Sequence, residues 1–279
     1  MKLGIHLPQY GRAASPDAIR RVASHAEHVG LADVWVSDHL VFPVGQEYPS
    51  AFLYDALATL AWVAGVTERI GLGTSVLVVP QYHPLELANH LASLDLLSGG
   101  RLTIGAGVGW SEAEFDALDQ GFHDRGVRMD EAIDVMRRVW TEDPATFDGE
   151  HYSFGELRVL PQPDRRIPIW IGGTSRAAYM RAAARGDGFQ AISIAPGDLA
   201  PILAEIRAAR GDRADEPFTI SYRTGWDPQG MDPAQIRDEW QAYAEVGVTH
   251  AVSAPWRTNA DDWIRSIDLL VELVEPDLA

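Results

Sequence analysis

The fold is decided by residues 2–37, KLGIHLPQYGRAASPDAIRRVASHAEHVGLADVWVS. Two short apolar runs, Lys2–Leu7 and Asp33–Ser37, flank a longer stretch with helical spacing, Ser15–Val29. The helical stretch begins at a serine followed by proline and ends just before Gly30, which are typical helix boundaries. Runs that are nearly continuous in apolar residues suit strands buried on both faces. The stretch therefore predicts a strand, a helix and a second, parallel strand.

The same pattern continues along the chain. Further strands are expected at Ile70–Val76, Leu102–Gly107, Pro168–Gly172, Gly188–Ser193, Phe218–Tyr222 and Val248–Ser253. Further helices are expected at Leu53–Val66, Pro84–Leu97, Arg125–Thr141, Ser175–Arg185, Pro196–Arg210, Pro233–Val246 and Ala260–Val274. Eight such units favour a (β/α)8 TIM barrel over an open, doubly wound sheet.

The interval between the fourth and fifth strands is too long for one unit. Residues Phe147–Phe154 predict a hairpin there, with Asp148 and Gly149 at its turn. We therefore expect a short insertion at this place. No repeat or linker divides the rest, so residues 1–279 are expected to form one domain.

Composition excludes several classes of function. The 279 residues carry a net charge of −17, which disfavours nucleic acid and anionic membrane surfaces as partners. The absence of cysteine excludes disulfides and thiolate chemistry and fits a reducing, cytoplasmic setting. The apolar run before Pro8 is too short for a signal peptide or a membrane span. A small-molecule partner is the remaining expectation.

In a (β/α)8 barrel the active site lies at the carboxyl ends of the strands. One glycine-dense strand end is Gly105–Trp110. It resembles the dinucleotide-binding motif G-x-G-x-x-G, but Trp110 stands where the motif requires its last glycine, so the motif is not present. Small residues there would let a flat ligand approach the backbone. They would equally relieve crowding where a strand leaves the barrel.

A second glycine-dense end, Gly172–Arg176, opens a helix. Its free backbone N–H groups, two hydroxyl groups and helix dipole suit an anion such as a phosphate. Thr174 or Ser175 could instead serve only as the N-cap of the helix.

Asp38 and His39 directly follow the second strand and are expected on the rim of the barrel. A histidine titrates near neutral pH, so His39 is the leading candidate for acid–base chemistry, although a structural role is the alternative. Asp38 could instead cap the loop that follows.

The remaining polar clusters point to no metal. His25 and His28 share a face of an outer helix and are expected to be solvated. His83 and His90 lie about 10 Å apart along a helix axis, too far for one ion. The three carboxylates after the fourth strand are also expected to be solvated; they are Glu112, Glu114 and Asp116.

Eight segments together resemble the luciferase-like superfamily of flavin- and deazaflavin-dependent oxidoreductases, over essentially the whole chain. They are KLGIHLPQYG (2–11), VWVSDHLVFP (34–43), IGLGTSVLVVP (70–80), LLSGGRLTIGAGVGW (96–110), RMDEAIDVMRRVW (128–140), FDGEHYSF (147–154), IPIWIGGTS (167–175) and GDGF (186–189). The Ser-Asp-His motif at residues 37–39 resembles the motif found in the branch of the superfamily that uses coenzyme F420. FMN is the alternative cofactor.

The resemblance implies roles for particular residues. Asp38 would line the cofactor, and His39 would lie beside the ring carbon that exchanges a hydride. The Ser75–Val76 peptide would be cis and bulge under the ring. The implied cofactor contacts are Thr74, Ser75, Val76, Gly107, Val108 and Gly109. The implied phosphate contacts are Gly172, Gly173, Thr174, Ser175 and Ala177. Because the chain is strongly acidic, a nearby arginine, Arg176 first, is expected to offset the general repulsion of the phosphate. The family also implies a homodimer.

Two departures bear on the substrate. The glucose-6-phosphate dehydrogenases of the superfamily carry an acidic residue where Trp110 stands and a tryptophan at the position of Pro43. A sugar phosphate is therefore not expected. An apolar or planar substrate is expected instead, in a pocket formed by His6, Gln9, Tyr10, Tyr54 and Trp110.

The resulting hypothesis is an oxidoreductase that moves a hydride between F420 and a small organic substrate, with His39 handling the proton. Two alternatives stay open on sequence alone. One is an FMN-dependent monooxygenase supplied by a separate reductase. The other is a deazaflavin carrier without catalytic activity.

Overall fold

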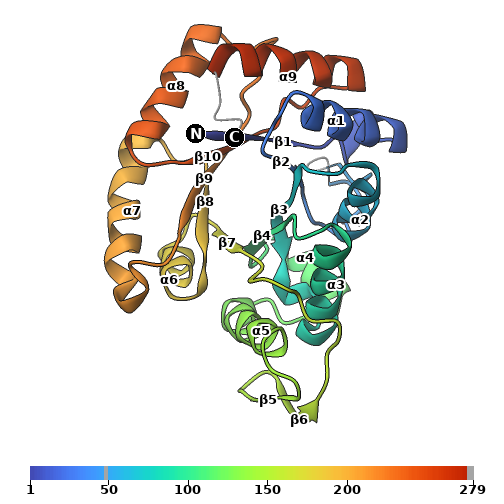
Figure 1. Ribbon diagram of the computed structural model, residues 1–279, viewed down its shortest axis with the longest axis vertical. Coiled ribbons are helices and arrows are strands. Elements are labelled where there is room, and N and C mark those ends of the chain that lie inside the picture. Colours follow the sequence, from blue (N-terminus) through green and yellow to red (C-terminus); the bar gives the residue numbers. More distant parts are fainter. Residues whose placement is uncertain (47–49, 275–279) are drawn as a thin grey trace.

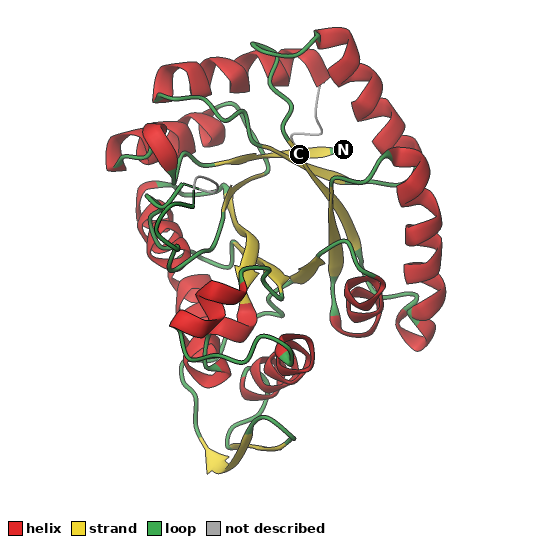
Figure 2. Cartoon of the chain, turned by 180° about the vertical axis from the view of Figure 1, so that it is seen from behind, coloured by secondary structure: helices red, strands yellow, loops and turns green. Residues whose placement is uncertain are grey.

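The computed structural model describes residues 1–46 and 50–274. Its centre is a closed barrel of eight parallel strands, enclosed by helices (Figures 1 and 2). The strands are β1 (Lys2–His6), β2 (Asp33–Val36), β3 (Gly71–Val78), β4 (Leu102–Gly107), β7 (Ile169–Gly172), β8 (Gly188–Ile192), β9 (Thr219–Thr224) and β10 (His250–Ser253). The predicted (β/α)8 barrel and its eight strands are confirmed.

The barrel closes between the first and last strands. β1 pairs with β10 from Lys2 opposite His250 to Ile5 opposite Ser253, and pairs on its other side with β2. A closed sheet leaves no strand edge exposed. Because every pairing in the ring is parallel, all eight carboxyl ends face the same rim.

The major helices form the outer ring. They are α1 (Pro16–His28), α2 (Ala56–Val66), α3 (Pro84–Leu97), α5 (Arg125–Val139), α6 (Arg176–Arg185), α7 (Pro196–Ala209), α8 (Pro233–Glu245) and α9 (Ala260–Val274). α1 begins as predicted, because the Ser15 hydroxyl accepts a hydrogen bond of 3.1 Å from the Ala18 N–H. Within the described chain, no helix is both long and apolar enough to cross a membrane.

The insertion before β7 forms the predicted hairpin from β5 (Ala145–Asp148) and β6 (Ser153–Leu157), which extends beyond α5 (Figure 1). A single carboxylate holds its turn: Glu131 of α5 accepts hydrogen bonds of 2.8–3.0 Å from three consecutive backbone amides, residues 150–152. Smaller helical elements were not predicted; they are α4 (Glu112–Ala117) and the 3-10 turns Gly11–Ala13, Val79–Gln81 and Gly211–Arg213.

Glycines make room for two tryptophans inside the barrel. Trp35 and Trp170 stack with ring centroids 5.2 Å apart. A Cβ atom at Gly73 would come within 2.4 Å of Trp35, and one at Gly188 within 2.5 Å of Trp170. A larger residue at either position would force the stacked rings to move.

A polar ladder runs beside these rings toward the rim. The His250 ring lies 2.9 Å from Asp33 on one side and 2.9 Å from the Ser221 hydroxyl on the other. Higher up, the Ser75 hydroxyl donates to the Gln190 side-chain carbonyl at 2.7 Å. Buried polar groups are tolerated when they are paired in this way.

One carboxylate ties the outer layer to the barrel. Glu27, in the last turn of α1, accepts hydrogen bonds of 2.7–2.9 Å from the amides of residues 68–70, immediately before β3. Burial alone would raise the pKa of Glu27, but these three amides, together with Arg69, outweigh it and hold the pKa below its usual range.

We expect Glu27→Gln to lower the free energy of unfolding at neutral pH by about 1–3 kcal/mol, since charge-assisted hydrogen bonds are lost. A depressed carboxyl pKa adds stability above the pKa of the unfolded chain and loses it as the pH falls through the folded value. Denaturant unfolding should therefore show the two proteins converging in acid. Glu68→Gln is the control, because that side chain is 86% exposed. An equal deficit for Glu27→Gln at every pH would contradict this account.

Candidate active site

A cavity of about 710 Å³ opens at the carboxyl ends of the strands. Such a volume lies within the usual range of small-molecule sites. The predicted residues that line it are Tyr10, Asp38, His39, Ser75, Val76, Gly107, Val108, Gly109, Trp110, Gly172, Gly173, Thr174 and Ser175. The predicted residues that do not reach its wall are His6, Gln9, Tyr54, Thr74 and Ala177.

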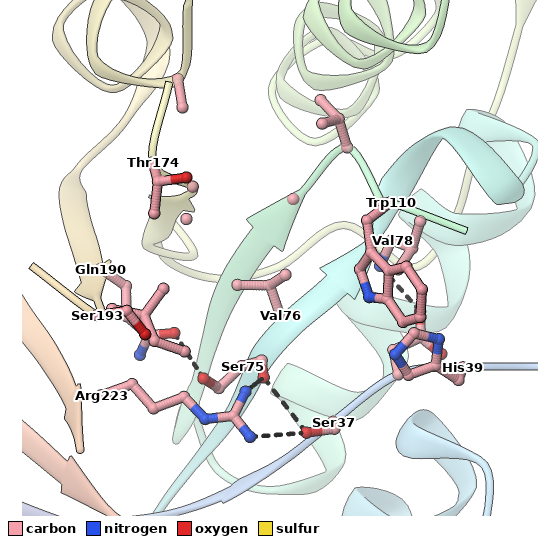
Figure 3. A pocket seen from close by; sticks show the side chains of 18 of the residues that line it. Ser37, His39, Ser75, Val76, Val78, Trp110, Thr174, Gln190, Ser193 and Arg223 are labelled. Carbon is pink, nitrogen blue, oxygen red and sulfur yellow. Dashed lines mark hydrogen bonds between the residues drawn. The ribbon is translucent and has the colours of Figure 1, made fainter. Parts of the chain in front are cut away.

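Val76 forms the floor of the cavity (Figure 3). The register between β3 and β4 shifts between Thr74 and Leu77, and the Ser75–Val76 peptide is cis, as the family resemblance implied. Thr74 is buried beneath this bulge, where its hydroxyl donates to the Gly105 carbonyl at 2.8 Å.

The glycines beside the floor relieve crowding. A Cβ atom at Gly107 would lie 2.5 Å from Val76, and one at Gly172 would lie 2.6 Å from it. Gly109 has φ +78°, and a Cβ there would lie 2.6 Å from Val78. The packing interpretation of the glycine-dense strand ends is therefore correct for these residues, which also form part of the cavity wall.

Arg223 lines the cavity, at a strand end where active-site residues are expected, although its sequence pattern predicted no particular role for it. Its guanidinium donates to the Ser75 carbonyl at 2.6 Å and to the Ser37 hydroxyl at 3.3 Å (Figure 3). The residue lies at the end of β9. Gln190, which holds the Ser75 hydroxyl, was not predicted. Together they place a positive charge and a polar network beside the floor.

His6 supports this network from behind the wall. Its Nδ1 donates to the Leu7 carbonyl at 2.9 Å, so its Nε2 accepts from the Ser37 hydroxyl at 2.9 Å. Burial, and then the nearby charge of Arg223, lower the pKa of His6 to about 3. The predicted role of His6 as a pocket wall is thus wrong, because the ring is fully buried and neutral.

Gln9 and Tyr54 are two further predicted residues that do not line the cavity. The Gln9 amide donates to the Ser37 and Tyr54 carbonyls, both at 2.7 Å, and its carbonyl accepts from the Ser37 N–H at 2.7 Å. Gln9 therefore uses its polar atoms to join the loops after β1 and β2. These contacts place the Gln9 side chain behind the wall, while Tyr54 takes part through its backbone carbonyl and its half-buried ring does not line the cavity.

Asp38 turns away from its own loop toward the end of β3. Its carboxylate accepts from the Val78 N–H at 2.9 Å and from the Tyr82 hydroxyl at 2.9 Å. Burial raises the pKa of Asp38 to about 6, although these two donors oppose the shift. The group joins β2 to β3 and does not cap the following loop.

His39 is held against a carboxylate that we expected to be solvated. Its Nδ1 lies 3.0 Å from Glu114, whose other oxygen accepts from the Leu40 N–H at 2.6 Å. Glu114 is only 1% exposed, whereas Glu112 and Asp116 on the same helix are exposed. Glu114 is buried rather than solvated because the short helix α4 turns its side chain inward. Trp110 packs edge-on to His39, with ring centroids 5.6 Å apart.

The far end of the cavity carries the predicted anion motif. Gly173 has φ +136°, and Ser175 is the N-cap of α6, accepting from the Ala178 N–H at 3.3 Å. The first N–H groups of a helix have no partner within the helix and are available to an anion. Thr174 does not cap the helix; its carbonyl accepts from Tyr179.

The structure places two residues of the anion motif differently from the expectation. Ala177 is exposed and does not line the cavity, whereas Ala178 does; a phosphate contact through the Ala177 backbone N–H stays a prediction. Arg176 pairs with Glu205 at 2.7 Å and does not line the cavity, whereas Arg181 does. Arg181 is oriented by Asp130 of α5 at 2.7 Å. The spacing of α6 explains this, because Arg181 is five residues, or about 1.4 turns, further along and therefore on a different face.

The described residues contain no group of three histidine or acidic side chains that could hold a metal ion, and the expectation of no metal stays a prediction. His28 is exposed, but His25 is half-buried and contacts Asp268 of α9 at 2.6 Å. The expectation that both are solvated is therefore wrong for His25.

The comparison with known families matches this architecture. The family model for luciferase-like monooxygenases matches residues 1–226. The chain belongs to the luciferase-like monooxygenase family. Within that family, the F420-dependent glucose-6-phosphate dehydrogenase of Beutenbergia cavernae is 33% identical over 267 residues, covering 87% of this chain and 78% of that protein. The uncharacterized protein Rv0953c of Mycobacterium tuberculosis is 30% identical over 284 residues, covering 94% of both chains.

Solved structures with the same fold cover almost the whole luciferase-like chain. The F420-dependent tetrahydromethanopterin reductase of Methanopyrus kandleri aligns with a TM-score of 0.80 at 19% identity, covering 100% of this chain and 99% of that one. An F420-dependent secondary alcohol dehydrogenase with an F420–acetone adduct aligns with a TM-score of 0.79 at 20% identity, covering 99% and 98%. At these identities the likeness is one of fold.

Proposed function

We propose that this protein is an oxidoreductase that moves a hydride between coenzyme F420 and a small, apolar or planar organic substrate. The observation that carries the proposal is His39 on the rim of a cavity whose opposite end is a helix N-terminus suited to phosphate. Two relatives that match over most of this chain, at 30% and 33% identity, are named F420-dependent glucose-6-phosphate dehydrogenases, which supports F420 over FMN.

The residues of the cavity fit a flat, phosphate-bearing cofactor. When bound, F420 supplies or accepts the hydride, and the protein supplies orientation and exclusion of water. Val76 would lie under the ring system, since its flanking glycines leave the floor free of other side chains. Gly173, Thr174 and Ser175 would hold the phosphate through the start of α6.

His39 would exchange the proton that accompanies the hydride. Its Nδ1 contacts the carboxylate of Glu114, and its Nε2 makes no hydrogen bond with any residue that the structure describes. A side chain on the cavity wall with one free ring nitrogen can donate a proton to, or accept one from, a substrate oxygen.

Aromatic side chains at the mouth favour an apolar or planar substrate. Tyr10 and Trp256 lie with ring centroids 5.1 Å apart, and Trp110 stands where the resembling sugar-phosphate dehydrogenases carry an acid. Both lining arginines are engaged by protein groups, Arg181 by Asp130 and Arg223 by Ser75. We therefore propose a neutral carbonyl or alcohol rather than a sugar phosphate. The homodimer and the cytoplasmic location stay predictions.

The first prediction from the proposed function concerns the cofactor. The purified protein should bind F420 more tightly than FMN in parallel fluorescence titrations, because the phosphate site is paired with an F420-type Ser-Asp-His at residues 37–39. Tighter binding of FMN would contradict the proposal. Binding of F420 without turnover across carbonyls, enones and alcohols would point to a carrier instead.

The second prediction concerns the phosphate end. Gly173→Val should weaken F420 binding by about tenfold or more, equivalent to about 1.4 kcal/mol or more. The reason is that φ +136° disfavours a side chain and that a Cβ atom would lie 2.9 Å from Ala178. Gly197→Val is the matched control, since nothing lies within 4 Å of a Cβ atom at that helix start. Equal affinities in the two variants would place the phosphate elsewhere.

The third prediction concerns the proton. His39→Ala should lower kcat by about 10²–10⁴-fold while the Kd for F420 changes only slightly, because the group acts on the substrate rather than on the cofactor. Steady-state kinetics and cofactor titration measure the two effects separately. His28→Ala on the exposed face of α1 is the control. Turnover at the parental rate in His39→Ala would make the histidine a wall of the pocket only.

A further inference from the structure

The carboxylate of Glu114 is buried directly behind the His39 ring. We propose that Glu114 is a positioning residue that fixes the tautomer of His39, so that Nε2 is the nitrogen that exchanges a proton with the substrate. The proposal rests on the proposed function for its consequence in catalysis. The placement of the ring proton itself can be tested without any cofactor.

The contact determines where the ring proton lies. Glu114 Oε2 is 3.0 Å from His39 Nδ1, and an ionised carboxylate can only accept a hydrogen bond. Burial would raise the pKa of Glu114, but the bonds from His39 and from the Leu40 N–H outweigh it and hold the pKa below its usual range. The ionised carboxylate therefore keeps the proton on Nδ1 and leaves the Nε2 lone pair free.

The second oxygen of the same carboxylate fixes the backbone beside the ring. Glu114 Oε1 accepts from the Leu40 N–H at 2.6 Å and from the Val41 N–H at 3.4 Å. One side chain of α4 thus holds both the imidazole and the loop after β2. Trp110 lies against the ring of His39 with centroids 5.6 Å apart (Figure 3). Phe42 contacts the same ring, also at 5.6 Å, and the two aromatic side chains restrict its plane.

The arrangement gives each nitrogen one task during the proposed oxidation of an alcohol. Nε2 would accept the hydroxyl proton, and the O–H electron pair would form the second carbon–oxygen bond as the carbon gives up its hydride, for which F420, when bound, supplies the acceptor. The imidazolium that results donates Nδ1–H to Glu114, which stabilises its charge. Carbonyl reduction is the reverse, with Nε2–H donated to the oxygen.

Glu114→Gln is the sharpest test, since it keeps the size of the side chain. The Gln carbonyl can keep the bond to the Leu40 N–H, which turns the NH₂ group toward His39. Nδ1 must then accept a hydrogen bond, and the ring proton moves to Nε2. Glu112→Gln on the same helix is the matched control, because Glu112 is exposed.

The first measurement is nitrogen NMR of histidine-labelled protein without cofactor, in alkaline buffer where imidazoles are neutral. The His39 signal is assigned by its loss in His39→Ala. We expect the Nδ1–H tautomer in the parent and Glu112→Gln, and the Nε2–H tautomer in Glu114→Gln. An Nε2–H tautomer in the parent overturns the proposal even if Glu114→Gln fails to fold.

The second measurement is steady-state kinetics on the best substrate found with F420. Glu114→Gln should lower kcat by about 10²-fold, with KM and the Kd for F420 nearly unchanged. If Glu114→Gln has the Nε2–H tautomer of His39 and still turns over with the parental kcat, the proposed contribution of the tautomer to catalysis is wrong. Absence of turnover in the parent would instead count against the proposed function, and the NMR result would still decide the role of Glu114.

Discussion

Everything at this site depends on a ring of eight parallel strands that closes between β1 and β10. In a closed parallel ring the carboxyl ends cannot alternate between faces, so the loops that follow all meet at one rim. Residues more than a hundred positions apart, such as Ser75 and Arg223, are within hydrogen-bond distance for this reason. The chemistry of the protein follows from which side chains those loops place there.

The floor and the wall of the cavity are held by different means. The floor is packed: Val76 fits only because Gly107 and Gly172 have no side chain. The wall is held by hydrogen bonds, since Ser37 links the buried, neutral His6 to the charged Arg223. Neutral His6 accepts a hydrogen bond from Ser37 and places no second positive charge beside Arg223. The pKa of His6 is lowered because burial and the charge of Arg223 both disfavour the protonated ring.

The sequence predicted the strands, most helices and the hairpin because each depends on local patterning of apolar residues, caps and turns. It also pointed to cavity residues that directly follow a strand, such as Asp38 and His39. It missed Glu114, because an acidic residue between two other acids looks solvated until the short helix turns it inward. It misplaced His6 for a related reason. The alternation of side chains along a strand does not tell whether a residue lies on the cavity wall or is buried behind it. Such distinctions depend on contacts between distant segments.

Adjacent residues after β2 illustrate how one short motif can serve two purposes. Asp38 and His39 both border the cavity, yet the carboxylate turns back to Val78 and Tyr82 while the imidazole contacts Glu114. Asp38 is buried among donors that only partly offset the loss of water, so its pKa rises to about 6. Glu114 receives a ring N–H and a backbone amide and stays ionised. The charge that can assist His39 therefore comes from the distant carboxylate of α4, while the neighbouring one joins two strands and keeps the rim in shape.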